Sequence, residues 1–310
     1  YGTSYYFRGA IDNNYVEFAN KCWRIVRITG DGSIKLVLHN DNINKVASPC
    51  AASNNDTTAA FARYSGTTYT TKFNSAMNDN AYVGFMYGEI GKTTYAETHK
   101  NSNKSAILQN LEKWYNTYIS TYESKLADTI WCNDKSVYKT TSYNPWSIGT
   151  RGTKYGIGTN VNYYNSVQRL VTNSNTTGGT GPILTCPNDN LGGKLSKFTV
   201  NDTVNGNGAL DKKIGLLTVD EIVFAGAVYK TANTTYYLYE NASGSQWWSL
   251  TPSHYGSGND SDVWRYLNSS EYIRGEAVNE AAGLRPALSL KSITTISKGT
   301  GTSSAPYVIN

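Results

Sequence analysis

"CWRIVRITGDGSIKLVL", residues 22–38, is the stretch of sequence that decides the fold class. β-Branched and aromatic residues flank Gly30-Asp31-Gly32, which is the pattern of a β-hairpin with a tight turn. We therefore predict paired strands at residues 22–29 and 33–38. Because alternate side chains of a strand share one face, the buried face is expected to carry Trp23, Ile25, Ile34, Leu36 and Leu38.

Two further stretches carry the signals of helices. In "SNKSAILQNLEKWYNTYISTYESKLAD" (residues 102–128), apolar side chains recur every three or four residues, with Ser102 or Asn103 as the cap. The expected apolar stripe is Ile107, Leu111, Trp114, Tyr118 and Tyr122. In "LLTVDEIVFAG" (residues 216–226), Thr218 and Glu221 fit a capping box and Gly226 fits a C-terminal stop. Capping accounts for Glu221, and a helix turns it about a hundred degrees away from Asp220.

The remaining apolar runs predict strands. We expect strands at "TTYYLYE" (residues 234–240) and at "QWWSLTPS" (residues 246–253), the latter entering a turn at Pro252. "LRPALSLK" (residues 284–291) predicts a central strand and "SSAPYVIN" (residues 303–310) an edge strand. Core packing is favoured over sugar stacking for Trp247-Trp248. Residues 135–215, rich in Gly, Asn and Thr, predict ordered surface loops.

The composition limits the class of protein. The chain has 310 residues, of which only 16% are charged, and it contains 25 Tyr and 28 Gly. The net charge of +5 is spread along the chain without a dense basic cluster, which argues against nucleic-acid binding. No apolar run of about 18 residues predicts a membrane span. The start at "YGTSYYFRGA" lacks a signal peptide, so we expect a processed N-terminus.

Four cysteines, Cys22, Cys50, Cys132 and Cys186, are widely spaced and form no CxxC pair, and zinc is therefore not expected. They allow two disulfides in three connectivities. We favour Cys22–Cys50 and Cys132–Cys186, because each pair brackets a stretch rich in Gly, Asn and Ser that closure would stabilise. Buried free thiols in a cytosolic protein are the alternative. Disulfides together with low charge indicate a location outside the cell.

No catalytic motif of the GxSxG, HExxH or Walker type occurs, so we predict a protein that is not an enzyme and has no cofactor. Asp189, Asp202 and Asp211 lie near Asn and Gly residues and could offer oxygens to a structural calcium ion. The pattern of an EF-hand loop is absent, however, and no metal site is predicted.

Residues 254–282 mix aromatic and charged side chains with Ser, Gly and Asn, in no helical or strand period. Tyr and Arg are the side chains that most often carry binding energy at interfaces. We predict an exposed ligand-binding face here, and a solvated pair of strands without a partner is the alternative. The predicted face comprises Tyr255, Asp260, Asp262, Arg265, Tyr266, Tyr272, Arg274, Glu276 and Glu280. Burial of the stretch from Arg265 to Glu276 would contradict this prediction.

Four motifs also carry a resemblance, namely residues 22–38, 216–226, "WWSLTPS" (247–253) and "GLRPALSLK" (283–291) in this order. They resemble a family of exported bacterial proteins with a C-type-lectin fold of the formylglycine-generating-enzyme type, which includes variable proteins diversified by retroelements. The resemblance implies an α+β fold with a twisted antiparallel sheet, two helices and extensive ordered loops. It also implies one domain over residues 1–310, with a core at 5–291, a ligand-display region at 254–282 and a C-terminal edge segment at 292–310. Carried over by position, the resemblance adds His254 to the predicted ligand-binding face.

The resemblance does not carry over an activity. The formylglycine-generating enzymes use cysteines close to this region, whereas the last cysteine here is Cys186. The calcium-binding motifs of animal lectins are absent as well. We therefore expect a protein of the bacterial cell surface that binds a protein or glycan ligand on another cell or on a host. The alternative is a structural subunit of a self-assembling surface filament, that is, a homopolymer.

Overall fold

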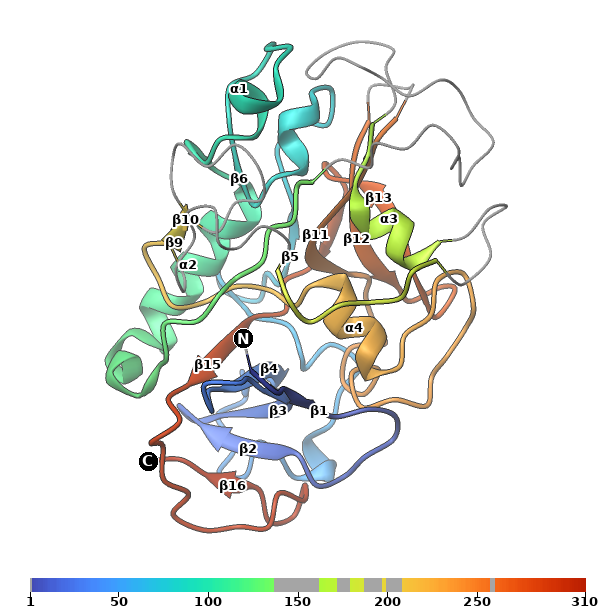
Figure 1. Ribbon diagram of the computed structural model, residues 1–310. Coiled ribbons are helices and arrows are strands. Elements are labelled where there is room, and N and C mark those ends of the chain that lie inside the picture. Colours follow the sequence, from blue (N-terminus) through green and yellow to red (C-terminus); the bar gives the residue numbers. More distant parts are fainter. Residues whose placement is uncertain (1, 137–161, 172–178, 187–196, 199–207, 257–259) are drawn as a thin grey trace.

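The chain folds into two six-stranded sheets flanked by helices, as the computed structural model in Figure 1 shows. The structure describes residues 2–136, 162–171, 179–186, 197–198, 208–256 and 260–310. The predicted α+β class is therefore confirmed. Asp189 and Asp202, two of the carboxylates considered for calcium, lie outside the described residues.

The first sheet is built around the predicted hairpin, with strand order β15-β4-β3-β2-β16 and β1 paired to the far end of β3. Trp23 lies opposite Leu38 and Ile25 opposite Leu36, and all four side chains are buried, so the hairpin and its apolar face are confirmed. The strands are β1 (Tyr5–Tyr6), β2 (Tyr15–Phe18), β3 (Lys21–Ile28), β4 (Ile34–Asn40), β15 (Ala287–Leu290) and β16 (Tyr307–Val308).

The second sheet has the order β13-β12-β11-β14-β5, with β8 paired to the end of β11. Its strands are β5 (Thr70–Lys72), β8 (Asn162–Tyr163), β11 (Trp247–Tyr255), β12 (Ser261–Leu267), β13 (Tyr272–Ala277) and β14 (Ala281–Gly283). Two small two-stranded sheets pair β6 (Met86–Tyr87) with β7 (Asn103–Lys104) and β9 (Lys197–Phe198) with β10 (Gly208–Ala209).

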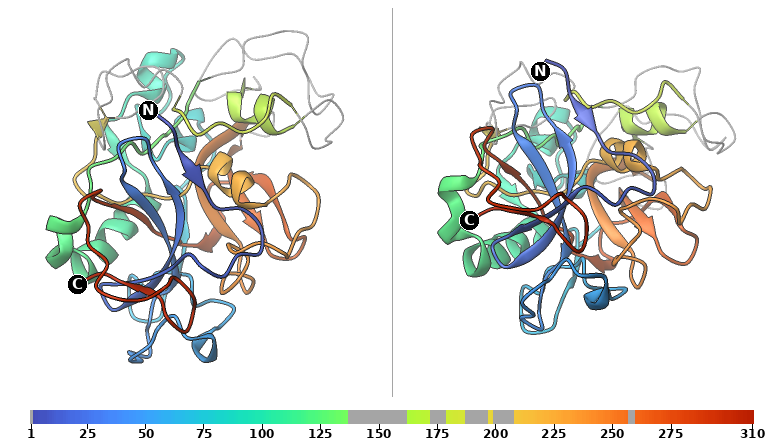
Figure 2. Two further views of the ribbon diagram at one scale, coloured as in Figure 1. Left: turned by 60° about the horizontal axis from the view of Figure 1, so that its bottom comes forward. Right: turned by 90° about the horizontal axis from the view of Figure 1, so that it is seen from below.

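Two helices were expected, and the described part of the chain contains four, α1 (Tyr95–His99), α2 (Ala106–Tyr118), α3 (Asn165–Leu170) and α4 (Val219–Ala225). Short 3-10 turns cover Ala52–Asn54, Asn80–Val83 and Ser120–Lys125. In Figures 1 and 2, α2 lies on one flank of the molecule and α3 and α4 lie on the opposite flank.

The long helix starts later than predicted. Ser105, and neither Ser102 nor Asn103, caps α2 by accepting a hydrogen bond from the backbone N–H of Leu108, because Asn103 is already paired in β7. The apolar stripe is buried at Ile107, Leu111 and Trp114, whereas Tyr118 is exposed beyond the sheet.

The short helix α4 agrees with its sequence signals. Thr218 and Glu221 form the full capping box, and Gly226 ends the helix at a φ of 140°. A side chain at position 226 would also collide with Tyr236, since an added Cβ would lie 2.7 Å from that residue's Cβ. Both the turn and the packing therefore require glycine here.

Three strand predictions need correction. Residues 234–240 form turns, because Tyr236 and Tyr237 are both buried and cannot alternate between core and solvent. Pro252 lies inside β11, at a register shift that tolerates its missing N–H. β15 is the last strand of its sheet, although isolated bridges from Leu126 and Gly215 cover its outer edge.

One cluster of buried apolar residues contains side chains from both sheets and from α2, α3 and α4. Trp247 and Trp248 are both buried in it, as predicted. Arg285, of the Arg-Pro motif, connects the two six-stranded sheets. Its guanidinium donates to the carbonyl oxygens of Leu38 and Leu238 at 3.1 and 2.6 Å and lies 4.8 Å from the Trp247 ring.

Both predicted disulfides, Cys22–Cys50 and Cys132–Cys186, are present in the structure. Such bonds persist in oxidising environments, so they are consistent with an extracellular protein. Among the described residues, no helix is long and apolar enough to cross a membrane.

Candidate functional site

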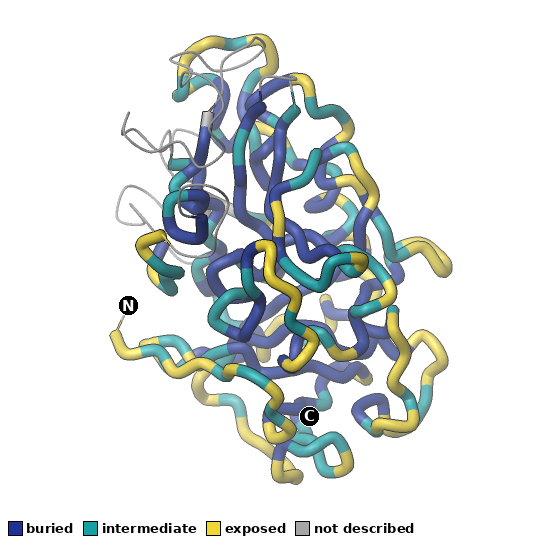
Figure 3. Tube along the Cα trace, turned by 90° about the vertical axis from the view of Figure 1, so that its right-hand side faces the viewer, coloured by how far each residue is buried: buried dark blue, intermediate teal, exposed yellow. Residues whose placement is uncertain are grey.

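Much of the predicted ligand-binding face is buried, which corrects the sequence interpretation. Tyr255, Asp262, Arg265 and Tyr266 are between 0 and 6% exposed, and all seven residues of β12 are buried. The reason is the place of β12 between β11 and β13, with both of its faces covered. Trp264 donates to Ser166 of α3 on one face. In Figure 3 the dark blue of buried residues fills the interior of the molecule, and the yellow of exposed residues lies mainly on outer loops.

The buried aromatic members of the predicted face contribute to the core. Tyr266 stacks on Trp247 at 5.9 Å, and the Tyr255 hydroxyl donates to the carbonyl oxygen of Asn78. These two tyrosines are therefore packing residues and not contact residues for a ligand.

Arg265 is also a structural residue. Its guanidinium lies 5.0 Å from the Trp248 ring and 3.5 Å from a Glu276 carboxylate oxygen. Nε and Nη1 are buried without a hydrogen-bond partner. Burial lowers the pKa of Arg265, with the nearby carboxylates of Glu276 and Glu280 acting in the opposite direction.

The remaining predicted residues do reach the surface. Arg274 and Glu280 are exposed, and Tyr272, Glu276, His254 and Asp260 are half-buried. Tyr272, Arg274 and Glu276 alternate along β13 with the buried Ile273 and Gly275, so they share the outer face of an edge strand. The Glu276 carboxylate connects the exposed side chains of β13 to the buried β12. Its oxygens lie 3.4 Å from a guanidinium nitrogen of Arg274 and 3.5 Å from one of the buried Arg265. We call Tyr272, Arg274 and Glu276 the outer row.

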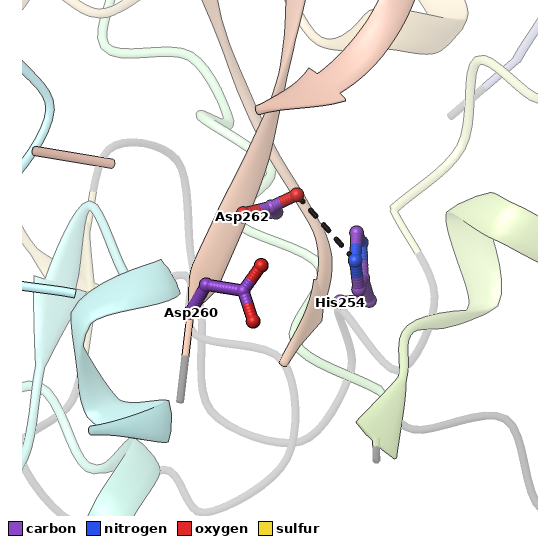
Figure 4. Close-up of side chains that lie close together, drawn as sticks. All are labelled: His254, Asp260 and Asp262. Carbon is purple, nitrogen blue, oxygen red and sulfur yellow. Dashed lines mark ion pairs between the residues drawn. The ribbon is translucent and has the colours of Figure 1, made fainter. Parts of the chain in front are cut away.

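His254, Asp260 and Asp262 gather at the end of the hairpin formed by β11 and β12 (Figure 4). His254 and Asp262 are direct cross-strand partners, and such partners place their side chains on the same face. His254 Nε2 lies 3.4 Å from Asp262 Oδ2, and His254 Nδ1 lies 3.2 Å from Ser253 Oγ. One nitrogen and two carboxylate oxygens of the three residues lie within 4.8 Å of one another.

Asp262 is in an unfavourable position for a charge. Its pKa is raised to about 6, mainly by burial and also by the carboxylates of Asp260 and Glu276, while His254 and Arg274 act in the opposite direction. Its Oδ1 has no hydrogen-bond partner. A buried carboxylate of this kind is costly unless a proton or a cation accompanies it.

A glycine fixes the end of the hairpin. The N–H of Gly256 donates to the Asp260 carbonyl at 2.9 Å, and a Cβ at position 256 would lie 2.3 Å from Asp260 Oδ1. The Asp260 carboxylate therefore occupies the space that a larger residue at position 256 would fill.

Ser253, His254 and Asp262 lie in a line that suggests nucleophilic catalysis, but the geometry argues against it. Ser253 is fully buried, and its Oγ faces Gly275, where an added Cβ would lie only 2.4 Å away. A nucleophile must reach its substrate, so this hydroxyl serves to orient the imidazole.

The cluster of His254, Asp260 and Asp262 could hold a metal ion. Asp211, the described carboxylate among those considered for calcium, already has a partner. Asp211 pairs with Lys104 at the surface. One imidazole nitrogen and two carboxylates suit first-row divalent metals better than calcium, which prefers oxygen ligands. Sequence analysis placed His254, Asp260 and Asp262 on the binding face but did not group them. The hairpin around Gly256 was the signal that could have done so.

A cleft of about 380 Å³, which no sequence motif indicated, lies beside the turn of the first hairpin. Arg27 and Lys35 line it, but Glu221 lies 3.1 Å from Arg27 and 2.7 Å from Lys35. Because Glu221 and Asp31, which also lines the cleft, together balance the two positive charges, the cleft offers a ligand little net charge. Glu221 is thus more than a helix cap, which corrects the sequence interpretation.

No family model, curated protein or solved structure matches this chain. The function is therefore argued from the outer row and from the cluster at the end of the hairpin.

Proposed function

We propose that this protein recognises a macromolecular ligand, a protein or a glycan, outside the cell and without catalysis. The contact surface is the outer row Tyr272, Arg274 and Glu276, continued by Glu280, while the half-buried His254 and Asp260 offer a second contact at the end of the neighbouring hairpin, on the opposite face of the sheet. The observation that carries the proposal is the contrast between neighbouring strands, since β12 is buried throughout while β13 alternates between core and surface.

The physical case is preorganisation. Binding loses affinity when side chains and loops must be ordered. Here the outer row stands on a strand whose neighbour is fixed by Trp264, by Tyr266 on Trp247, and by the Arg265 guanidinium on Trp248. The ordering of this backbone is therefore complete before a ligand arrives, and a parallel bridge from Tyr229 to Ile273 holds the outer edge of β13 as well.

The proposal also includes the type of fold and the location of the protein. We propose a C-type-lectin-like fold of the formylglycine-generating-enzyme type and a location on the bacterial cell surface. The order of the four sequence motifs supports the fold, and the two disulfides support an oxidising location. The buried Ser253 hydroxyl supports recognition over nucleophilic catalysis.

The proposal is tested with labelled protein applied to glycan arrays and to intact bacterial and eukaryotic cells. The variant Tyr272→Ala/Arg274→Ala removes the two largest side chains of the outer row. A matched control, Tyr5→Ala/Lys298→Ala, removes an exposed tyrosine and an exposed cation elsewhere.

Two hot-spot side chains at about 1–2 kcal/mol each predict at least a tenfold loss of binding for the first variant, with no loss for the control. The melting temperature of both should stay close to that of the unmodified protein. Retained binding by the outer-row variant, or absence of binding by the unmodified protein on every surface, would contradict the proposal.

A further inference from the structure

The buried carboxylates of the described residues fall into two groups. Five of them use both oxygens to accept hydrogen bonds, each from at least two donors within 3.0 Å. These five are Asp41, Asp79, Asp134, Asp220 and Glu221. The sixth, Asp262, has its nearest cation at 3.4 Å and no partner for Oδ1.

Asp262 is 6% exposed, so bulk water does not replace the missing donors. Figure 4 shows its carboxylate beside that of Asp260, with the imidazole of His254 across the same space. A second carboxylate in this place only increases the cost of the negative charge. Among the described residues, His254 and Arg274 are the positive groups that act on this carboxylate, and no donor reaches Oδ1, so a further cation would lower the cost of the buried charge.

The distance between His254 and Asp262 identifies the kind of positive charge. A charge-assisted hydrogen bond joins nitrogen and oxygen at about 2.7–2.9 Å, and the observed separation is 3.4 Å. Two ligands of a tetrahedral ion, each at about 2.0–2.2 Å from the metal, stand about 3.3–3.5 Å apart. The observed distance fits two ligands of one ion and is too long for a shared proton.

Ser253 prepares the imidazole for this role. With the proton on Nδ1, His254 donates to Ser253 Oγ at 3.2 Å, and the lone pair of Nε2 faces Asp262. A partner on the second ring nitrogen is the usual way in which proteins orient a metal-binding histidine. A lone pair that faces a carboxylate is repelled by it unless a cation lies between them.

We propose that His254, Asp260 and Asp262 bind a divalent first-row transition ion, with Zn²⁺ preferred over Mn²⁺, through Nε2 and two carboxylate oxygens. The preference follows the general order of affinity for nitrogen and oxygen ligands. Asp260 closes on the ion by about one ångström, because the three atoms now spread over as much as 4.8 Å.

Three protein ligands leave at least one position of the ion open, as in catalytic zinc sites. That position accepts an oxygen atom of a ligand, such as a carboxylate or a sugar hydroxyl. This role of the ion rests on the proposed function, whereas the binding of the ion does not.

The test uses the full chain without a polyhistidine tag, treated with a chelator and then titrated calorimetrically with ZnCl₂ and MnCl₂. The unmodified protein should bind one ion of either metal, and Zn²⁺ more tightly. The other two histidines, His39 and His99, are fully buried and do not compete for added metal.

Asp262→Asn keeps the shape of the side chain and should weaken zinc binding by at least about 100-fold, more than the loss of a supporting residue causes. Asp260→Asn, at a less buried position, is the second variant and should weaken binding at least tenfold. Asp211→Asn, which removes an exposed carboxylate elsewhere, should bind like the unmodified protein. Circular dichroism verifies that each variant is folded.

Failure of the ion site and failure of the proposed function are distinguishable. An unmodified protein that binds no zinc, or an Asp262→Asn variant that binds it unchanged, would overturn the ion site. If Asp262→Asn loses zinc but still captures ligand on the arrays, the ion site stands and its role in recognition is wrong. Capture that the chelator abolishes and Zn²⁺ restores would support both.

Discussion

Replacement of Glu221 by Gln tests how the first sheet and α4 are joined. The carboxylate of Glu221 accepts from Lys35 Nζ at 2.7 and 2.8 Å and lies 3.1 Å from Arg27 Nε. Arg27 and Lys35 are cross-strand partners on β3 and β4. Gln has the same shape and can still cap the helix, so the substitution removes the charge and little else.

The expected loss is large because the ammonium that remains is buried. The side chains of Lys35 and Glu221 are 4% and 2% exposed. Breaking a buried pair by removing one partner costs about 3–5 kcal/mol. A chain of 310 residues has an unfolding entropy of about 0.65 kcal/mol/K, so the melting temperature should fall by about 5–8 °C.

The pH dependence of the free energy of unfolding is a second, independent measure of the Lys35–Glu221 pair. The pKa of Lys35 is lowered to about 8, mainly by burial and also by Arg27, while Glu221 acts in the opposite direction. An unfolded lysine titrates near 10.4, so between about pH 8 and 10.4 the unfolded chain binds more protons than the folded one. Lys35 therefore makes the free energy of unfolding rise with pH across that window, by up to about 1.4 kcal/mol per unit. Without Glu221 the pKa falls further, so the deficit of the variant should shrink as the pH rises to about 8 and stay level above it.

Urea unfolding at pH 7 and at pH 9.5 measures both effects. Glu221→Gln/Lys35→Met should recover most of the lost stability, because no unpaired ammonium is left. Glu123→Gln is the matched control. Its side chain is 49% exposed and lies 3.8 Å from Lys213, so we expect a change below about 1 kcal/mol. Equal losses for Glu221→Gln and Glu123→Gln would refute the reasoning.

Three further predictions concern stability and the hairpin cluster. Arg265→Met removes two unpaired buried donors, so the free energy of unfolding should change by less than about 1 kcal/mol or rise. Arg285→Met removes two charged hydrogen bonds, so the free energy of unfolding should fall by about 3 kcal/mol. Urea denaturation compares the two, and a larger loss for Arg265→Met would contradict the burial argument. Cys132→Ala/Cys186→Ala opens a loop with a sequence separation of 54 and should cost about 4 kcal/mol, with non-reducing peptide mapping as the check on the pairing. Gly256→Ala displaces the flexible end of Asp260, so calorimetry should show weaker zinc binding while the melting temperature hardly changes.

Features that depend on near neighbours in the chain were predictable from the sequence. The Gly30-Asp31-Gly32 turn fixes the hairpin, and Thr218 with Glu221 fixes the start of α4, because each signal acts within a few residues. The helix boundary that was predicted wrongly depends on contacts with residues farther away along the chain. Ser105 replaces Ser102 as the cap of α2 only because β7 pairs with β6, a strand about sixteen residues earlier.

The sequence indicated which stretch of the chain contains the candidate site, but it did not indicate which side chains of that stretch are exposed. Tyr and Arg serve equally well in an interface and in a core that pairs their polar groups, so composition alone cannot distinguish Arg265 from Arg274. The distinction comes from strand order, which places β12 inside the sheet and β13 at its edge. His254 and Asp262 meet through a register that shifts next to Pro252, and a strict count of alternating residues does not give that register.

β12 contains two incompletely paired charges, on opposite faces of the strand. Arg265 has two buried donors without acceptors, and Asp262 has one buried acceptor without a donor. Each such atom costs about 1–3 kcal/mol, yet the chain elsewhere pairs its buried carboxylates fully. The two cases differ in what could relieve the cost. Glu276 and Trp248 already partly compensate Arg265, whereas Asp262 faces a second carboxylate and an imidazole at 3.4 Å (Figure 4), so that a proton or a bound cation would relieve its cost. Among the described residues, Asp262 is the one buried carboxylate with an oxygen that has no partner, and this difference from Asp220 and Glu221 is the basis of the proposed ion site.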